Sequence, residues 1–129
     1  MINKENLPTV TGNFGKLELR ENGIIYYYKK DDLVTNYEVA VEVLDSICKL
    51  DNSGKARVIL IQGVPTSYTF DAQQILAVAT CMSKAAIVVQ NAIQIQTGNV
   101  LKSIAKAHNA IFELEVFESI EEAEAWMAI

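Results

Sequence analysis

From residue 35 onward, segments with helical periodicity alternate with short runs of β-branched residues, and this alternation constrains the fold more than any other feature. Two of these runs, Ala56 to Ile61 and Ala86 to Gln90, are mostly apolar, as in strands that are covered on both faces. Parallel strands of one sheet are joined by crossovers long enough to contain a helix. We therefore predict a largely parallel sheet with helices packed on it, and Ala56 to Ile61 as its central strand.

Two of the expected helices begin at capping sequences. Residues 35–38 and 119–122 have the spacing of a capping box, with Thr35 and Ser119 supplying the hydroxyls that accept hydrogen bonds from free helical N–H groups. The apolar periodicity predicts helices over 35–51, 70–83, 93–107 and 119–127, and a last strand over 111–117. About four helices are thus expected.

The N-terminal part of the chain has two different patterns. Residues 1–15 contain proline, glycines and polar residues without periodicity, so an irregular arm is expected there. From Lys16 apolar and charged residues alternate, Asn22 and Gly23 favour a tight turn, and Ile24 to Tyr28 follows as a second strand. We therefore predict a single α/β domain over 16–129. Its mixed five-stranded sheet would start with this β-hairpin and continue through three strand–helix units.

Size and charge exclude several classes of protein. A chain of 129 residues is long enough for one ordinary domain. Its net charge of −5 argues against sequence-independent binding of nucleic acid, which needs clustered basic residues. No apolar run approaches the roughly 20 residues of a membrane-spanning helix. With no segment typical of a secretory signal, we expect a cytoplasmic protein.

The sequence contains little that indicates catalysis. No glycine-rich phosphate-binding motif follows a predicted strand, and no nucleophile elbow is present. The single histidine, His108, falls near the end of a predicted helix, where it is expected to offset the helix dipole rather than to bind a metal. We expect a protein that is not an enzyme and has no metal or cofactor. An enzyme using His108 with a tyrosine or glutamate is the weakest alternative.

Two groups of residues are candidates for binding. Thr66, Ser67 and Thr69 lie in the loop after the central strand, where open N–H groups bind anions and hydroxyls are presented to solvent, although the loop also fits a plain polar connection. Tyr26 and Tyr28 share one face of the hairpin strand. With Tyr68 they are candidates for a ligand or partner surface, although packing in the core or on the sheet face is the preferred explanation for the tyrosines of the strand.

The order of these elements resembles that of the STAS fold. The similarity includes the hydroxyl-rich loop, Gly98 with Asn99, and the closing run from Val116 to Trp126, which is like that of small, uncharacterised bacterial STAS-like proteins. Anti-sigma factor antagonists of this family bind a kinase partner and are released when a serine or threonine of this loop is phosphorylated. The resemblance implies Ser67 as the nearest phosphoacceptor, with Thr66 and Thr69 behind it. The family's Asp before the hydroxyls and Gly after them are absent here.

The leading expectation is therefore a non-enzymatic, STAS-like regulatory domain that acts through protein contacts, as a homodimer or with another protein. The alternative is a carrier or sensor of a small, lipid-like apolar ligand, held in a pocket between the sheet and its helices. The high apolar content of the chain favours this alternative.

Overall fold

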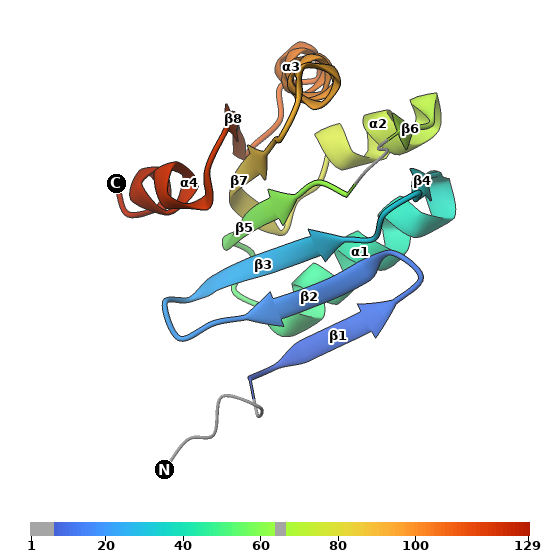
Figure 1. Cartoon of the computed structure of the whole chain (residues 1–129). Helices are drawn as coiled ribbons and strands as arrows, with labels where there is room; N and C mark the ends of the chain where they lie inside the picture. Colours follow the sequence, from blue (N-terminus) through green and yellow to red (C-terminus); the bar gives the residue numbers. More distant parts are fainter. Residues whose placement is uncertain (1–6, 64–66) are drawn as a thin grey trace.

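In the computed structural model, which describes residues 7–63 and 67–129, six strands form one mixed sheet and four helices pack against it (Figure 1). In sheet order the strands are β1 (Thr9–Gly12), β2 (Gly15–Leu19), β3 (Ile24–Lys29), β5 (Ala56–Ile61), β7 (Met82–Val88) and β8 (Glu113–Phe117). The helices are α1 (Tyr37–Leu50), α2 (Phe70–Ala77), α3 (Ala92–Ala107) and α4 (Ile120–Met127). Two short strands, β4 (Val34–Thr35) and β6 (Ser67–Tyr68), pair with each other outside the main sheet.

The sheet changes from antiparallel to parallel at β3. β1, β2 and β3 are antiparallel neighbours, whereas β3, β5, β7 and β8 run parallel. The prediction of an α/β fold with a mixed sheet and about four helices is confirmed, and β5 lies inside the sheet between β3 and β7 as expected. None of the helices in the described ranges is long and apolar enough to cross a membrane.

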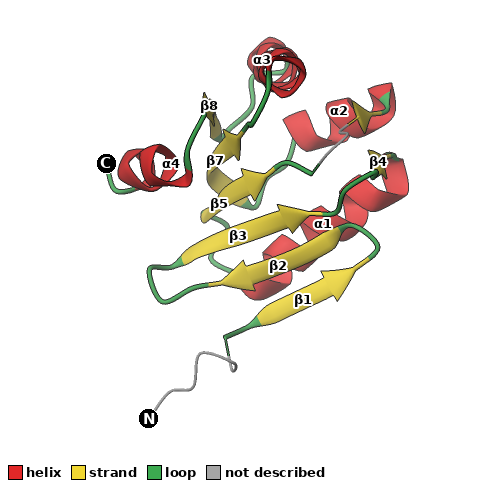
Figure 2. Ribbon diagram, in the orientation of Figure 1, coloured by secondary structure: helices red, strands yellow, loops and turns green. Residues whose placement is uncertain are grey.

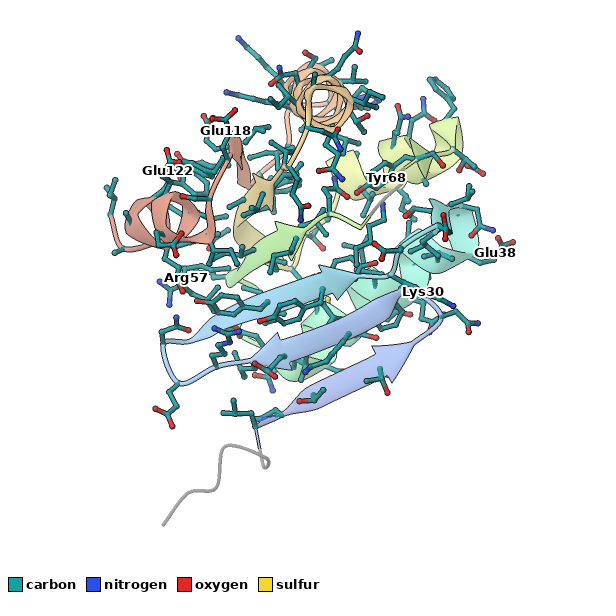
Figure 3. The ribbon with its side chains drawn as sticks, viewed as in Figure 1. Lys30, Glu38, Arg57, Tyr68, Glu118 and Glu122 are labelled. Atoms are coloured by element: carbon teal, nitrogen blue, oxygen red, sulfur yellow. The ribbon has the colours of Figure 1, made fainter. Side chains whose placement is uncertain are left out.

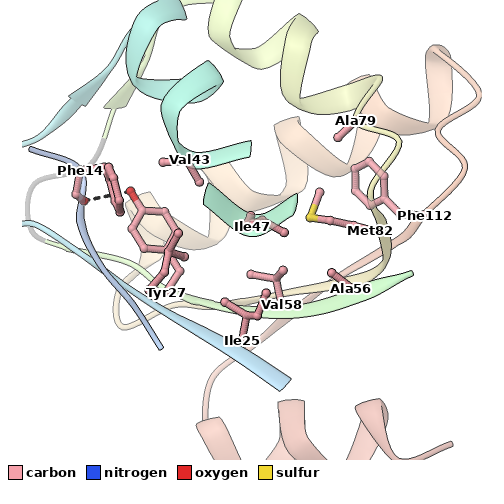
Figure 4. Packing of buried hydrophobic residues seen from close by; sticks show 11 residues of the cluster. Phe14, Ile25, Tyr27, Val43, Ile47, Ala56, Val58, Ala79, Met82 and Phe112 are labelled. Carbon is pink, nitrogen blue, oxygen red and sulfur yellow. Dashed lines mark hydrogen bonds between the residues drawn. The ribbon is translucent and has the colours of Figure 1, made fainter. Parts of the chain in front are cut away.

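The two faces of the sheet have separate cores. α1, α2 and α3 lie on one face and α4 lies on the other (Figure 2). On the three-helix face, Tyr27 is buried beside Phe14, with the ring centroids 5.8 Å apart and the Tyr27 hydroxyl donating to the Phe14 carbonyl at 2.9 Å (Figure 4). Tyr26 points to the α4 face and packs in its core. Alternation along β3 thus places successive tyrosines in different cores.

Basic side chains of the sheet hold the end of α4. Arg57 on β5 and Lys84 on β7 are cross-strand partners. The Arg57 guanidinium donates to the Met127 carbonyl at 3.3 Å, and the Lys84 ammonium donates to the carbonyls of Trp126 at 3.0 Å and Ile129 at 3.2 Å. The last carbonyls of a helix lack partners within it and carry the negative end of its dipole. These contacts explain why α4 covers this part of the sheet.

The N-terminal expectation is wrong in part. Thr9–Gly12, expected to be irregular, forms β1 and adds a sixth strand to the sheet, while residues 1–6 lie outside the described part of the chain. The predicted hairpin is confirmed as β2 and β3, but only Gly23 of its turn has a positive φ, at 79°. The β-branched residues Thr9, Val10 and Thr11 suit a strand, but the run is short, and pairing with β2 gives it a place in the sheet.

Some element boundaries also differ from the predictions. α2 ends at Ala77 rather than at Ser83, and Met82 already belongs to β7. The side chain of Asn36, not that of Thr35, caps α1 by accepting a hydrogen bond from the Val39 N–H at 2.9 Å. Ser119 caps α4 as expected, with its hydroxyl 3.1 Å from the Glu122 nitrogen.

Candidate ligand-binding site

An apolar cavity of about 90 Å³ lies between the three-helix face of the sheet and the helices that cover it. Its walls are formed by Tyr27, Thr35, Ala40, Val43, Leu44, Ile47, Val58, Leu60, Tyr68, Leu76, Ala77, Met82, Ala85, Ile87, Leu101, Ala105, Phe112 and Leu114. All but three of these side chains are hydrocarbon or thioether. Alanines from all three helices and from β7 form part of the wall, and their short side chains leave space that larger residues fill in a close-packed core.

Thr35 supplies a polar atom to this apolar cavity. It lies on β4 and is only 4% exposed. Its hydroxyl oxygen is buried and has no hydrogen-bond partner among the described residues. Its backbone carbonyl, by contrast, accepts a hydrogen bond from the Thr69 N–H at 2.9 Å. Because leaving such a group unpaired costs about 1 to 3 kcal/mol, the hydroxyl offers a ready partner to a polar group that enters the cavity.

A cluster of polar side chains surrounds Tyr68 at the end of the sheet where β3 and β5 finish (Figure 3). The Tyr68 hydroxyl donates to the Gln62 side-chain oxygen at 3.2 Å, and the Lys29 nitrogen lies 3.7 Å from the centre of the Tyr68 ring. Burial lowers the pKa of Lys29 to about 7, and burial also raises the pKa of Tyr68. The Gln94 amide donates to the Gly63 carbonyl at 3.0 Å. These contacts connect β3, β6, α3 and the residues that directly follow β5.

The hydroxyls of the loop after β5 have different environments. Ser67 is exposed on β6, where it pairs in register with Val34. Thr69 caps α2: its hydroxyl oxygen lies 3.4 Å from the Ala72 nitrogen and bonds to the carboxylate of Asp71. Thr66 lies outside the described residues. Ser67 is therefore the accessible hydroxyl of the two that the structure describes.

The three candidate tyrosines do not form one surface. Tyr26 and Tyr28 share the α4 face of the sheet, as expected, whereas Tyr68 lies on the cavity side. Tyr26 has no exposed area, because the Arg20 guanidinium covers its ring at 3.8 Å and its hydroxyl bonds to Asn22 and Glu124. Tyr26 therefore packs in the core, the alternative that the sequence also allowed, and it has no area exposed to solvent.

Charged residues fill the rest of this face. Arg20 bonds to Glu18 at 3.0 Å and to the Tyr28 hydroxyl, and Lys16 lies 3.3 Å from the same Glu18 carboxylate. Burial raises the pKa of Glu18, but the hydrogen bonds from Arg20 and Lys16 lower it, and the net shift is downward. These charged side chains are thus paired with one another on the polar surface beside Tyr26.

His108 lies at the end of α3. It is the C-cap residue, and its Nδ1 is 3.0 Å from the Ile104 carbonyl of the preceding turn. Over the described ranges, no cluster of three or more His, Cys, Asp or Glu side chains is arranged to hold a metal ion. The contact of His108 with its own helix fits a role at the helix end.

Comparison of the chain with protein-family models, with curated proteins and with solved structures found no match.

Proposed function

We propose that this protein is a carrier or sensor that holds a small, mostly apolar molecule in the cavity between the sheet and α1, α2 and α3. The observation that carries the proposal is an apolar cavity whose lining includes Thr35, a residue with a buried hydroxyl that has no hydrogen-bond partner in the described part of the chain. Binding sites for small molecules typically combine a mainly apolar lining with a few polar groups that orient the ligand. The ligand would accept a hydrogen bond from Thr35 or donate one to it.

The size of the cavity limits the ligand. At about 90 Å³ it is smaller than an engineered cavity of roughly 150 Å³ that admits benzene. The buried part of the ligand is therefore a short alkyl chain or small ring of a few non-hydrogen atoms with one polar substituent. A longer lipid would place only one end here, unless the helices separate.

Native mass spectrometry of the protein isolated from its own organism tests this proposal. We expect a retained molecule that organic solvent extracts and whose mass fits the cavity. In Ala105→Leu, three added carbon atoms occupy the cavity, so the adduct should disappear, whereas Ala107→Leu on the exposed side of the same helix should keep it. Xenon and benzene serve as defined probes of the stripped protein, detected by NMR. The proposal would be contradicted if the isolated wild-type protein carries no small molecule and binds neither xenon nor benzene.

A second candidate function is the STAS-like regulatory domain, acting through a homodimer or another protein. It is supported by exposed apolar side chains near Ser67, at the start of α1 and α2: Val34 is 54%, Tyr37 47% and Phe70 70% exposed. Solvent-exposed apolar groups gathered in one region are typical of contact surfaces.

Sedimentation of wild type and Phe70→Asp tests this second candidate. A dimer that Phe70→Asp dissociates supports it, provided that Ile129→Asp, a matched change at a 91% exposed residue next to α4, leaves the dimer intact. Phosphate on Ser67 in protein isolated from its own organism would support regulation by phosphorylation. This candidate would be contradicted if the protein is a monomer, carries no phosphate, and binds its partners equally well after Ser67→Ala.

A further inference from the structure

The fold brings together the two cysteines of the chain. Cys48 lies in the last part of α1, and Cys81 lies in the turn between α2 and β7. The Cys81 sulfur lies 3.8 Å from the carbonyl of Leu44, one turn before Cys48 on α1, and the two thiols are close enough to influence each other's pKa. Both side chains are unoxidised and partly exposed. Residues 33 positions apart in sequence thus place two accessible thiols side by side.

We propose that Cys48 and Cys81 are an oxidation site, at which an intramolecular disulfide cross-links α1 to the start of β7. The oxidant is a low-molecular-weight disulfide. One cysteine thiolate attacks it, forming a mixed disulfide and releasing one small thiol. The second thiolate then displaces the other small thiol and forms the Sγ–Sγ bond. The protein loses two electrons and two thiol protons, and the small disulfide becomes two thiols.

The local structure permits this bond. A disulfide requires sulfur atoms about 2.05 Å apart, closer than two neighbouring thiols that are not bonded to each other. Cys81 lies outside every helix and strand, so the turn can adjust while α1 stays in place. Burial, together with the neighbouring Cys48 thiol, raises the pKa of the Cys81 thiol to about 12. Cys81 must act as a thiolate in one of the two steps, and its thiolate is scarce at neutral pH. We therefore expect the disulfide to form slowly and to form faster as pH rises.

The position of the cross-link gives it a structural effect. Leu44 and Ile47 of α1 and Met82 of β7 flank the two cysteines and line the cavity. The bond would close a loop that contains β5, β6 and α2, and would join two walls of the cavity covalently. This inference depends on the contact between the thiols and not on whether a ligand occupies the cavity.

The reduced, folded protein in a series of glutathione redox buffers tests the proposal. We expect both free thiols to disappear together in a monomer without bound glutathione, with a cross-linked Cys48–Cys81 peptide after digestion and a higher midpoint of thermal unfolding. Cys48→Ser and Cys81→Ser should each instead retain one glutathione as a stable mixed disulfide.

Three results would overturn the proposal. They are glutathione adducts that persist on the wild type, disulfides that form only between chains, and a cross-link that forms only in denaturant. Circular dichroism of each variant shows whether it remains folded, and the peptide map of the wild type decides the question even where a serine variant does not.

Discussion

Replacing Thr35 by valine should stabilise the protein. Valine has nearly the shape of threonine, so the change replaces a buried hydroxyl, for which no described residue is a partner, by a methyl group in an apolar wall. A buried polar group without a partner costs about 1 to 3 kcal/mol. Valine also suits the extended conformation of β4. We therefore expect the free energy of unfolding to rise by about 1 to 3 kcal/mol.

The shift in melting temperature follows from the chain length. Unfolding entropy near 60 °C is about 2.1 cal/mol/K per residue, which for 129 residues is about 270 cal/mol/K. The gain in free energy then corresponds to an increase of about 4 to 11 °C. Calorimetry and urea unfolding should be performed on protein refolded after extraction with organic solvent, because a bound ligand would pair the hydroxyl and hide the effect.

Two further variants make the test specific. Thr69→Val removes a hydroxyl that caps α2, so we expect a loss of about 1 kcal/mol. Thr35→Ser keeps the unpaired hydroxyl and removes a buried methyl group, so it should also destabilise, by about 1 kcal/mol. If Thr35→Val in the stripped protein is as destabilising as Thr69→Val, the hydroxyl of Thr35 has a partner and our reasoning about the cavity wall is refuted.

Three other predictions concern the charges and close contacts of the sheet. Lys84→Met should lower the free energy of unfolding by about 1 kcal/mol, because it removes the donor to the last carbonyls of α4. Lys102→Met breaks an exposed ion pair and should lower it by at most about 0.5 kcal/mol; urea unfolding followed by tryptophan fluorescence measures both. The pKa of Lys29 is about 7 in the folded protein and 10.5 for an ordinary lysine, so between these pH values the unfolded chain binds more protons than the folded one. The free energy of unfolding should therefore rise from pH 7 to pH 9, by up to about 1.4 kcal/mol per pH unit. Urea unfolding of Lys29→Met at the same pH values should show this slope removed, and an unchanged slope would contradict the burial of the amine. Gly63→Ala should lower stability by about 1 to 3 kcal/mol in the same assay, because its Cβ would lie 2.6 Å from a backbone carbonyl oxygen.

Sequence reasoning identified the elements that carry a strong pattern of their own. The apolar run of β5 and the capping serine of α4 correspond closely to the structure. β1 was missed because its β-branched run from Thr9 to Thr11 is only three residues long and stands among the proline, glycines and polar residues of the N-terminal segment. The end of α2 was placed too late because the small and apolar residues from Val78 to Met82 fit a helix as well as a turn followed by a strand.

The candidate site was harder to predict than the fold. A pocket between the sheet and its helices was expected, but the sequence did not indicate which residues line it. Thr35 was interpreted as a helix cap, and only the three-dimensional arrangement shows that Asn36 takes this role and leaves the threonine hydroxyl in the cavity wall. The one hint in the sequence was an alanine in each of α1, α2, α3 and β7 that turns out to line the cavity. Whether these alanines face one another depends on which helix packs on which strand, and hydrophobic periodicity does not predict that packing.

The order of strands in the main sheet has a consequence for how the chain folds. Each strand pairs with the strand that precedes it in that sheet along the sequence, so the order β1-β2-β3-β5-β7-β8 follows the chain from one edge to the other. No strand has to enter between two strands that are already paired. The sheet can grow by addition at a single open edge, and each addition closes only the loop through one crossover. Loop-closure entropy is therefore lost in small steps, which favours faster folding than in a sheet of equal size whose central strands come last in the sequence.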